Sequence, residues 1–230
     1  MTCPSQSQEP TPSLAPASGS PEKTCREFNP FQELLQNRDV RSLSLDTVNL
    51  REFSPFQRTL LALDGTVTKY LEAYTLEPIE VVRLRQETQR LKDPHHWLEI
   101  PPDTETVARE VLLRGAYSGI VYAYAVSLLV PERLPGDWFQ LLDSERGGIG
   151  RALLSNQVES RRKLLWYGRE QLPELPEDIR ALTGAEFLSR SYCIILGGKP
   201  VMLINEKFPI DVEIHLSTAL AQSFAGDGRA

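Results

Sequence analysis

Two charged side chains stand in rows of otherwise apolar residues, and such breaks in a pattern are candidates for function. In the segment ETVAREVLLR (105–114), the alternation of side chains along an extended strand places Arg109 on the same face as two valines and a leucine. In the segment VMLINEKF (201–208), Glu206 shares a face with Met202, Ile204 and Phe208 in the same way. Burying either charge is costly unless it is paired or hydrogen-bonded, so both residues need partners.

The chemistry that this pair can do is the recognition of a small anion that also carries a hydroxyl group. A guanidinium binds a carboxylate through two parallel hydrogen bonds, and a carboxylate accepts a hydrogen bond from a hydroxyl. We therefore predict a pocket in which Arg109 holds a ligand carboxylate and Glu206 holds a ligand hydroxyl. The alternation also allows a less favoured arrangement without a pocket, in which the two residues pair with each other or lie at strand ends and reach water.

A glycine-rich segment, GGIGRALL (147–154), is the third candidate. It precedes a predicted short helix, and the backbone N–H groups at the start of a helix can bind a carboxylate. A flexible turn followed by a helix cap is an equal alternative. A dinucleotide-binding loop is not supported, because no strand precedes the glycines and no complete G-x-G-x-x-G follows.

Nucleophilic and metal chemistry find little support in the sequence. Cys193 lies among apolar residues of a predicted strand and is interpreted as a small core residue. His95 and His96 follow a proline in a predicted loop, and G-x-S-x-G does not occur. The spacing of the histidines and cysteines matches no zinc motif, so no metal is expected. The basic run 161–163 alternates between faces, so it is mostly solvated surface, with one of the three residues turned toward a ligand.

Three short amphipathic helices are predicted before the first strand. Two of them begin with a proline at the first helical position, preceded by a residue that caps helices well, Asn29 or Ser54. Gly65 separates the second helix from the third. The predicted helices cover residues 29–38, 54–63 and 66–75.

The period of the pattern then changes from 3.6 to 2, which indicates strands. Two pairs of strands are joined by short turns, the second through Gly197 and Gly198, and such short connections make neighbouring strands antiparallel. We predict an α+β fold: a six-stranded antiparallel sheet with helices packed on one face and a buried internal ligand site. The predicted strands cover residues 79–88, 105–114, 120–130, 157–167, 187–196 and 201–208.

The composition excludes partners that need a strongly basic surface. The chain has 230 residues, with 25 Lys and Arg against 31 Asp and Glu, and a formal net charge of −6. Nucleic acids and anionic membranes both require a surplus of Lys and Arg, so neither is expected to bind. The sequence contains no run of about 20 apolar residues, which is the length needed to span a membrane. A small anion is compatible with this composition if a few local cations bind it.

Cysteine usage and local composition indicate how the chain is organised. The three cysteines are far apart, which argues against disulfides and favours a reducing compartment, so a cytoplasmic location is expected. Residues 1–25 are rich in Pro, Ser, Gln and Thr and are predicted to be a disordered tail. We predict a single domain over residues 26–224 and a short flexible C-terminus over 225–230.

The order and spacing of five segments resemble those of one known family. The chain carries, in this order, TVTKYLEAY, IEVVRLRQET, AREVLLRG, GIGRALL and GGKPVMLINEKFP. Over residues 56–209 it is similar to the chorismate lyase (chorismate pyruvate-lyase) family, and most similar to the cyanobacterial and mycobacterial branch. The resemblance implies a monomeric carbon–oxygen lyase that converts chorismate into 4-hydroxybenzoate and pyruvate without metal or cofactor. It also implies that the product is the first intermediate of a quinone headgroup such as that of plastoquinone.

The resemblance further assigns roles to residues of this chain. It places the carboxylate-binding arginine at Arg109 and the hydroxyl-binding glutamate at Glu206. The backbone amides that hold the same carboxylate fall at Val67 and Ile149. Enterobacterial members carry a further arginine in a G-R-T-V-V-P motif, where this chain reads V-S-L-L-V-P with Ser127.

Because this chain has Ser127 in place of that arginine, it is open which cation binds the enolpyruvyl carboxylate of chorismate. Lys69, Arg151 and Arg162 are the candidates.

Two functions of other classes remain as alternatives. The same fold occurs as the ligand-sensing domain of bacterial transcription regulators, in which a DNA-binding helix-turn-helix precedes the sensor. Here the preceding residues are rich in proline and serine and are not basic, which favours the enzyme. The other alternative is a non-catalytic protein that binds a hydroxybenzoate.

Overall fold

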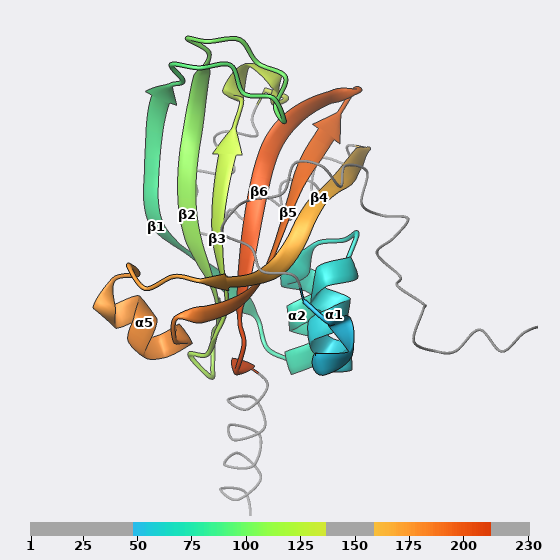
Figure 1. Ribbon diagram of the computed structural model, residues 1–230, viewed down its shortest axis with the longest axis vertical. Coiled ribbons are helices and arrows are strands. Elements are labelled where there is room, and N and C mark those ends of the chain that lie inside the picture. Colours follow the sequence, from blue (N-terminus) through green and yellow to red (C-terminus); the bar gives the residue numbers. More distant parts are fainter. Residues whose placement is uncertain (1–47, 137–158, 213–230) are drawn as a thin grey trace, which may run out of the picture.

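The computed structural model describes residues 48–136 and 159–212, whose strands form one six-stranded antiparallel sheet (Figure 1). The strand order is β1-β2-β3-β6-β5-β4, so two three-stranded meanders meet where β3 pairs with β6. The predicted α+β fold with a six-stranded antiparallel sheet is confirmed. The strands are β1 (Ile79–Arg90), β2 (Glu105–Gly115), β3 (Val121–Leu129), β4 (Ser160–Gln171), β5 (Glu186–Leu196) and β6 (Lys199–Pro209).

Four of the predicted features lie outside the described residues. They are the tail at 1–25, the helix at 29–38, the glycine-rich segment at 147–154 and the C-terminus at 225–230. The domain boundaries therefore stay predictions. In the described part of the chain, no helix is long and apolar enough to cross a membrane.

Helices α1 (Pro55–Ala62) and α2 (Val67–Thr75) cover one face of the sheet. A capping box starts α1: the Ser54 hydroxyl accepts a hydrogen bond from the backbone N–H of Gln57, and the Gln57 side chain accepts one from the N–H of Ser54. Helix α2 ends at Leu76, whose backbone is left-handed with φ 57°. Both helices contribute to one core cluster with the sheet, which includes Phe56, Leu60, Leu71, Leu113 and Phe208.

Helix α5 (Glu177–Thr183) lies on the opposite face and is not predicted by the sequence pattern. Its buried Ile179 packs with Leu112 and Tyr124, whose side chains alternate with those beneath α1 and α2. Figure 1 shows α5 and the α1–α2 pair on opposite sides of the lower half of the sheet. This helix has only seven residues, two of them buried, so its amphipathic pattern is too short to recognise. The prediction that helices pack on one face of the sheet therefore applies to α1 and α2, and α5 is an addition on the other face.

Both predicted hairpin turns are present. In the β5–β6 turn, Gly197 and Gly198 have φ angles of 53° and 80°, which are left-handed values that glycine adopts readily. This turn sets the register in which β5 and β6 pair.

The carboxylate of Glu77 holds the β2–β3 turn. It accepts hydrogen bonds from the backbone N–H groups of Tyr117 (2.9 Å) and Ser118 (3.0 Å) and from the hydroxyls of Ser118 (2.7 Å) and Tyr122 (2.7 Å). Burial alone would raise the pKa of Glu77, but these hydrogen bonds outweigh it and keep the pKa below its usual value. The carboxylate comes so close to Gly115 that a Cβ atom there would lie 2.2 Å from Oε1.

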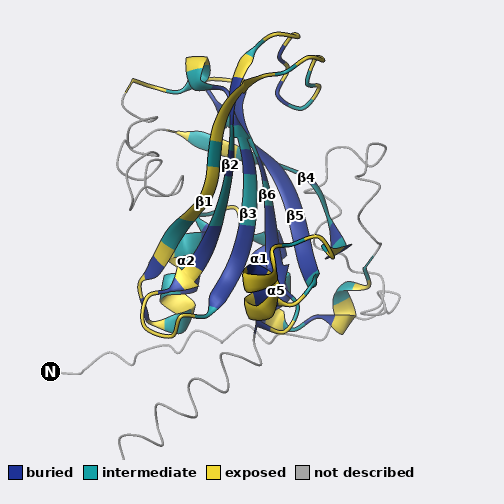
Figure 2. Cartoon of the chain, turned by 90° about the vertical axis from the view of Figure 1, so that its left-hand side faces the viewer, coloured by how far each residue is buried: buried dark blue, intermediate teal, exposed yellow. Residues whose placement is uncertain are grey.

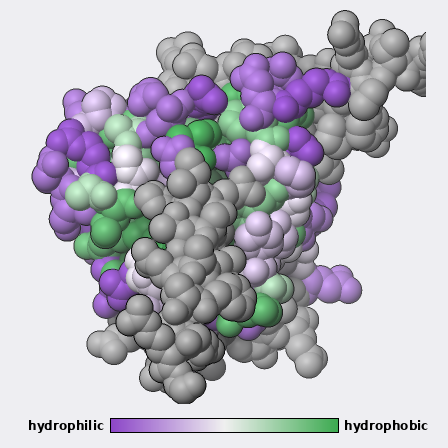
Figure 3. All heavy atoms as spheres, turned by 90° about the horizontal axis from the view of Figure 1, so that it is seen from below, coloured by the Kyte–Doolittle hydropathy of each residue, from purple (hydrophilic) through white to green (hydrophobic). Residues whose placement is uncertain are grey.

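The core follows the central strands of the sheet. Figure 2 shows β3, β5 and β6 largely buried, whereas most of β1 beyond its first residues is intermediate or exposed. Seen from below, hydrophilic residues cover much of the outline, and apolar residues gather in separate patches between them (Figure 3). Charged residues on the central strands are therefore the exception in this molecule, and they mark the candidate site.

Candidate functional site

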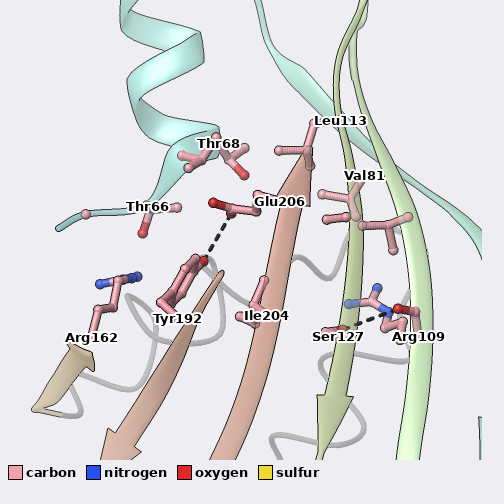
Figure 4. Close-up of a pocket in the computed structure, with 14 residues that line it drawn as sticks. Thr66, Thr68, Val81, Arg109, Leu113, Ser127, Arg162, Tyr192, Ile204 and Glu206 are labelled. Carbon is pink, nitrogen blue, oxygen red and sulfur yellow. Dashed lines mark hydrogen bonds between the residues drawn. The ribbon is translucent and has the colours of Figure 1, made fainter. Parts of the chain in front are cut away.

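A cavity lies between the sheet and the first turn of α2 (Figure 4). The cavity proper has a volume of about 60 Å³, and it opens into a wider space of about 560 Å³ without protein atoms, part of which is solvent. Every strand of the sheet contributes at least one residue to its lining. The polar and charged lining residues are Thr66, Thr68, Arg109, Ser127, Arg162, Tyr192 and Glu206.

The strand register sets how Arg109 and Glu206 lie relative to each other. Arg109 on β2 pairs with Ser127 on β3, and Ser127 pairs with Ile204 on β6, two residues before Glu206. Glu206 itself pairs with Ala125. The small side chains of Ala125 and Ser127 line the cavity between the two charged residues.

Glu206 forms a buried ion pair with Arg190 on β5. The Arg190 Nε donates to Glu206 Oε2 at 2.8 Å, and the two residues are 1% and 6% exposed. The same guanidinium donates to the carbonyl oxygens of Leu63 (2.7 Å) and Leu61 (3.4 Å), at the end of α1. The partner that a buried carboxylate requires is thus supplied by β5, and it also anchors a helix.

Arg190, the ion-pair partner of Glu206, is a residue of the candidate site that the sequence-based prediction missed, although a signal for it exists. In the strand around it, alternation places Arg190 on the same face as Leu188 and Tyr192. This is the pattern that singles out Arg109 and Glu206. Arg190 is thus a third charged residue in an otherwise apolar row, and it belongs with the candidates.

Tyr192 completes the surroundings of the Glu206 carboxylate. Its hydroxyl donates to Glu206 Oε1 at 3.0 Å, and Figure 4 shows the phenol and the carboxylate directed toward each other in the cavity. Burial above all, and the neighbouring Glu206 charge, raise the pKa of Tyr192, while the charges of Arg190 and Arg162 lower it less. The phenol therefore stays protonated and orients the carboxylate.

Arg109 lines the cavity from β2 and is 4% exposed, so the buried position that alternation predicts is confirmed. The hydroxyl of Ser127 makes a long hydrogen bond, 3.5 Å, to the carbonyl oxygen of Arg109. This contact is to the backbone and does not engage the guanidinium. The role of Arg109 in binding a carboxylate stays a prediction.

The start of α2 also borders the cavity. Val67 is the first residue of the helix and lines the cavity together with Thr66 and Thr68. The first N–H groups of a helix have no partner within it, and the side chain of Thr66 makes no capping hydrogen bond to them. Val67 therefore borders the cavity at the start of the helix, and the role of its amide in binding an anion stays a prediction.

The remaining predicted residues are placed differently. Lys69 does not line the cavity; its side chain is 58% exposed and forms an ion pair with Glu72. Ile149 and Arg151 lie outside the described residues. Arg162 lines the cavity from β4.

Cys193 lies on the other side of its strand from the cavity-lining Tyr192. Its thiol is 1% exposed and contacts the carbonyl oxygen of Trp97 at 3.4 Å. Burial raises the pKa of the thiol to about 11, so it stays protonated near neutral pH, and its interpretation as a core residue is confirmed. Within residues 48–136 and 159–212, no three His, Cys, Asp or Glu side chains come together in a group that could hold a metal ion.

Residues 61–216 match a family model described as "Chorismate pyruvate-lyase Rv2949c-like". The chain belongs to this family. The match begins at the end of α1 and continues beyond β6, so it includes every residue that lines the cavity.

Curated members with this name are similar over most of their length. The chain is 28% identical over 176 residues to the chorismate pyruvate-lyase of Mycobacterium leprae. The aligned region covers 72% of this chain and 79% of that protein. It is 23% identical over 184 residues to the chorismate pyruvate-lyase of Mycobacterium tuberculosis H37Rv, covering 76% of this chain and 84% of that protein. The resemblance stated from the five sequence segments is confirmed.

Among solved structures, the chorismate pyruvate-lyase fold seen here is similar to the effector domain of PhnF from Mycobacterium smegmatis. The TM-score is 0.50 at 12% identity, and the similarity covers 64% of this chain and 90% of that domain. At this identity the likeness concerns the fold alone.

Proposed function

We propose that this protein is a chorismate pyruvate-lyase, which eliminates pyruvate from chorismate and leaves 4-hydroxybenzoate. One observation carries the proposal: in a chain of this family, one cavity holds Arg109 and Glu206 on either side of small side chains. Chorismate carries a ring carboxylate, a ring hydroxyl opposite to it, and an enolpyruvyl ether with a second carboxylate. A cation and a hydrogen-bond acceptor facing one cavity match the first two groups.

Arg109 binds the ring carboxylate in this proposal. Its guanidinium can offer two parallel, charge-assisted hydrogen bonds, which are stronger than bonds between neutral groups. The N–H of Val67 adds a donor at the positive end of α2. The resemblance adds the amide of Ile149 as a further donor. These local groups bind a small anion even though the whole chain carries a net charge of −6.

Glu206 accepts the hydrogen bond of the ring hydroxyl. Its two oxygens already accept one hydrogen bond each, from Arg190 and from Tyr192. A carboxylate has about four acceptor sites, so capacity for a ligand hydroxyl remains. Because both existing contacts are buried, the carboxylate is held in place before the ligand arrives, which favours the correct orientation of the substrate.

The reaction balances within chorismate itself. Ring carbon C4 loses a proton, the bond between C3 and the ether oxygen breaks, and a new C3–C4 double bond makes the ring aromatic. The ether oxygen becomes the keto oxygen of pyruvate, and its methylene carbon takes up a proton to become the methyl group. No oxidant or reductant is consumed, so the residues of the cavity mainly position and polarise the substrate. Glu206, at the C4 hydroxyl, lies next to the carbon that loses its proton.

We also propose that the 4-hydroxybenzoate made here supplies a quinone headgroup of the plastoquinone type. The support is the resemblance to the cyanobacterial branch of the family. Deletion of the gene should abolish that quinone, and 4-hydroxybenzoate in the medium should restore it. Unchanged quinone levels after deletion would remove this part of the proposal.

A non-catalytic module that binds a hydroxybenzoate is the alternative. The likeness to an effector domain favours it, although that likeness concerns the fold alone. Turnover separates the two functions. Purified protein is mixed with chorismate, and 4-hydroxybenzoate and pyruvate are measured over time by chromatography. Equimolar products at a rate proportional to protein concentration support the lyase, whereas 4-hydroxybenzoate binding without turnover would identify the module.

A further inference from the structure

Arg162 is the second arginine of the cavity, and it reaches the cavity from the second meander. It lies on β4, two residues before Leu164, which is the register partner of Tyr192. Figure 4 shows Arg162 and Arg109 at opposite ends of the cavity, with Tyr192 and Glu206 between them.

The hydrogen-bonding capacity of Arg162 is unused within the described ranges 48–136 and 159–212. Its Nε is buried there without a hydrogen-bond partner, and its guanidinium forms no ion pair with a described carboxylate. Arg190 also has one buried nitrogen, Nη2, without a partner there, but its Nε and Nη1 donate to a carboxylate and to two backbone carbonyls. A guanidinium carries five N–H donors in a fork that fits a carboxylate. Arg162 is therefore equipped to bind an anion that enters the cavity.

Of the other two candidates for a second carboxylate, Arg151 lies outside the described residues, and Lys69 is less well placed. Lys69 is mostly exposed, is paired with Glu72 and lies outside the lining of the cavity. Ser127 lines the cavity but carries no charge. Among the described cations, Arg162 thus joins Arg109 as a charge that borders the cavity.

The spacing of the two arginines suits a ligand with two anionic groups. Four inter-strand steps separate β2 from β4 in the sheet, which is about 19 Å between their backbones at ~4.8 Å a step. Both side chains line the cavity from these strands, and Tyr192 and Glu206 lie between them (Figure 4). A ligand with a single carboxylate can engage only one of them.

We propose that Arg162 binds the second carboxylate of a dicarboxylate substrate while Arg109 binds the first, so that Arg162 distinguishes substrate from product. This inference rests on the proposed function, in which the enolpyruvyl carboxylate of chorismate is the second anion. 4-Hydroxybenzoate has lost that carboxylate and has no group that reaches Arg162.

Substitutions at Arg162 test this assignment. Arg162→Gln removes the charge, Arg162→Lys keeps the charge without the fork, and Arg161→Gln changes an exposed neighbour as the matched control. For each variant, kcat and KM are measured with chorismate, and Kd is measured for 4-hydroxybenzoate by calorimetry. We expect Arg162→Gln to lower kcat/KM about 10- to 100-fold, the loss of a charged hydrogen bond, with the Kd for 4-hydroxybenzoate near the wild-type value. Arg162→Lys should recover part of the loss, and Arg161→Gln should behave as wild type.

Each contrary outcome has a distinct meaning. An unchanged kcat/KM in Arg162→Gln overturns the assignment. A loss of 4-hydroxybenzoate affinity as large as the loss of kcat/KM also overturns it, because Arg162 would then contact the ring portion of the ligand or support the fold. If the wild type does not convert chorismate, the proposed function fails, and the Kd of chorismate is compared instead. Weaker chorismate binding in Arg162→Gln with unchanged 4-hydroxybenzoate binding would still support the assignment, whereas equal affinities for chorismate would overturn it.

Discussion

Arg190 and Glu206 are register partners on β5 and β6, and the guanidinium Nε of one lies 2.8 Å from the carboxylate Oε2 of the other. The same guanidinium donates to the carbonyl oxygen of Leu63 at the end of α1. One buried side chain therefore holds the candidate catalytic carboxylate and the helix layer at once. Substitutions at this contact should therefore affect both the stability of the fold and the carboxylate of Glu206, and the two effects can be measured separately.

Removal of Arg190 alone leaves Glu206 buried without its cation. We expect Arg190→Leu to lower the free energy of unfolding by about 3–5 kcal/mol, measured by urea denaturation. The double variant Arg190→Leu/Glu206→Leu should be more stable than Arg190→Leu, because it removes the unpaired charge as well. A double variant whose loss equals the sum of the two single losses would show that the pair is not coupled.

Substitution of Glu206 should affect the chemical step. Glu206→Gln keeps the shape of the side chain but removes the charge, and we expect kcat to fall by roughly 10²–10⁴-fold. Tyr192→Phe removes one hydrogen bond to the same carboxylate, so its loss of kcat should be smaller, about fivefold. Steady-state kinetics with chorismate measures both. Equal losses in the two variants would place the phenol, not the carboxylate, at the reacting atoms.

Arg109 should control the affinity for the ring carboxylate. We expect Arg109→Gln to raise the Kd of 4-hydroxybenzoate about 10- to 100-fold, since a charge-assisted, bidentate contact is lost. Arg114→Gln is the matched control, because Arg114 is an exposed arginine of the same strand that pairs with Glu80 and does not line the cavity. Calorimetric titration at one pH and salt concentration gives both values. Wild-type affinity in Arg109→Gln would exclude this residue from the binding of the ring carboxylate.

Acid should destabilise the fold through Glu77. Its pKa in the folded protein lies below the ordinary value of 4.5. A lowered folded pKa contributes stability above the unfolded value, and that stability is lost as the pH falls through the folded value. Between about pH 6 and pH 3, the unfolding free energy should therefore fall more for the wild type than for Glu77→Gln. Parallel pH profiles of the two proteins would show that Glu77 is not the group involved.

Gly115 should tolerate no side chain. A Cβ atom at this position would lie 2.2 Å from the Glu77 Oε1 and 2.4 Å from the Ser118 hydroxyl. We expect Gly115→Ala to cost about 1–3 kcal/mol of stability, because the turn must shift to make room. Gly136→Ala is the control, since a Cβ atom there would meet no atom within 4 Å. Equal urea midpoints for the two variants would contradict the close approach of Glu77.

The alternation of side chains is sufficient to find the charged residues of the cavity on β2 and β6. Alternation is a local property of an extended chain, so it identifies a buried face without knowledge of the neighbouring strands. The same reasoning extends to Arg190 on β5. The pairing of Arg190 with Glu206 is different, because it depends on the register between two strands, which no local pattern specifies.

The face of Arg162 could not be predicted from the sequence for a further reason. A bulge between Leu164 and Trp166 changes the register of β4, so Leu164 and Tyr167 pack into one cluster although their positions differ by three. A strict period of two fails across such a point. The structure selects Arg162 as the member of the basic run 161–163 that lines the cavity.

The junction of the two meanders has a consequence for folding. Arg109 belongs to the first meander, whereas Glu206 and Arg162 belong to the second, and the two meet only where β3 pairs with β6. Tyr124 and Lys207, far apart in the chain, must come together to form that junction, and such non-local pairing is slow to form. A ligand that contacts residues of both meanders opposes their separation, so its binding should stabilise the completed sheet. Ligand binding can then serve as a measure of how much of the protein has formed the complete sheet.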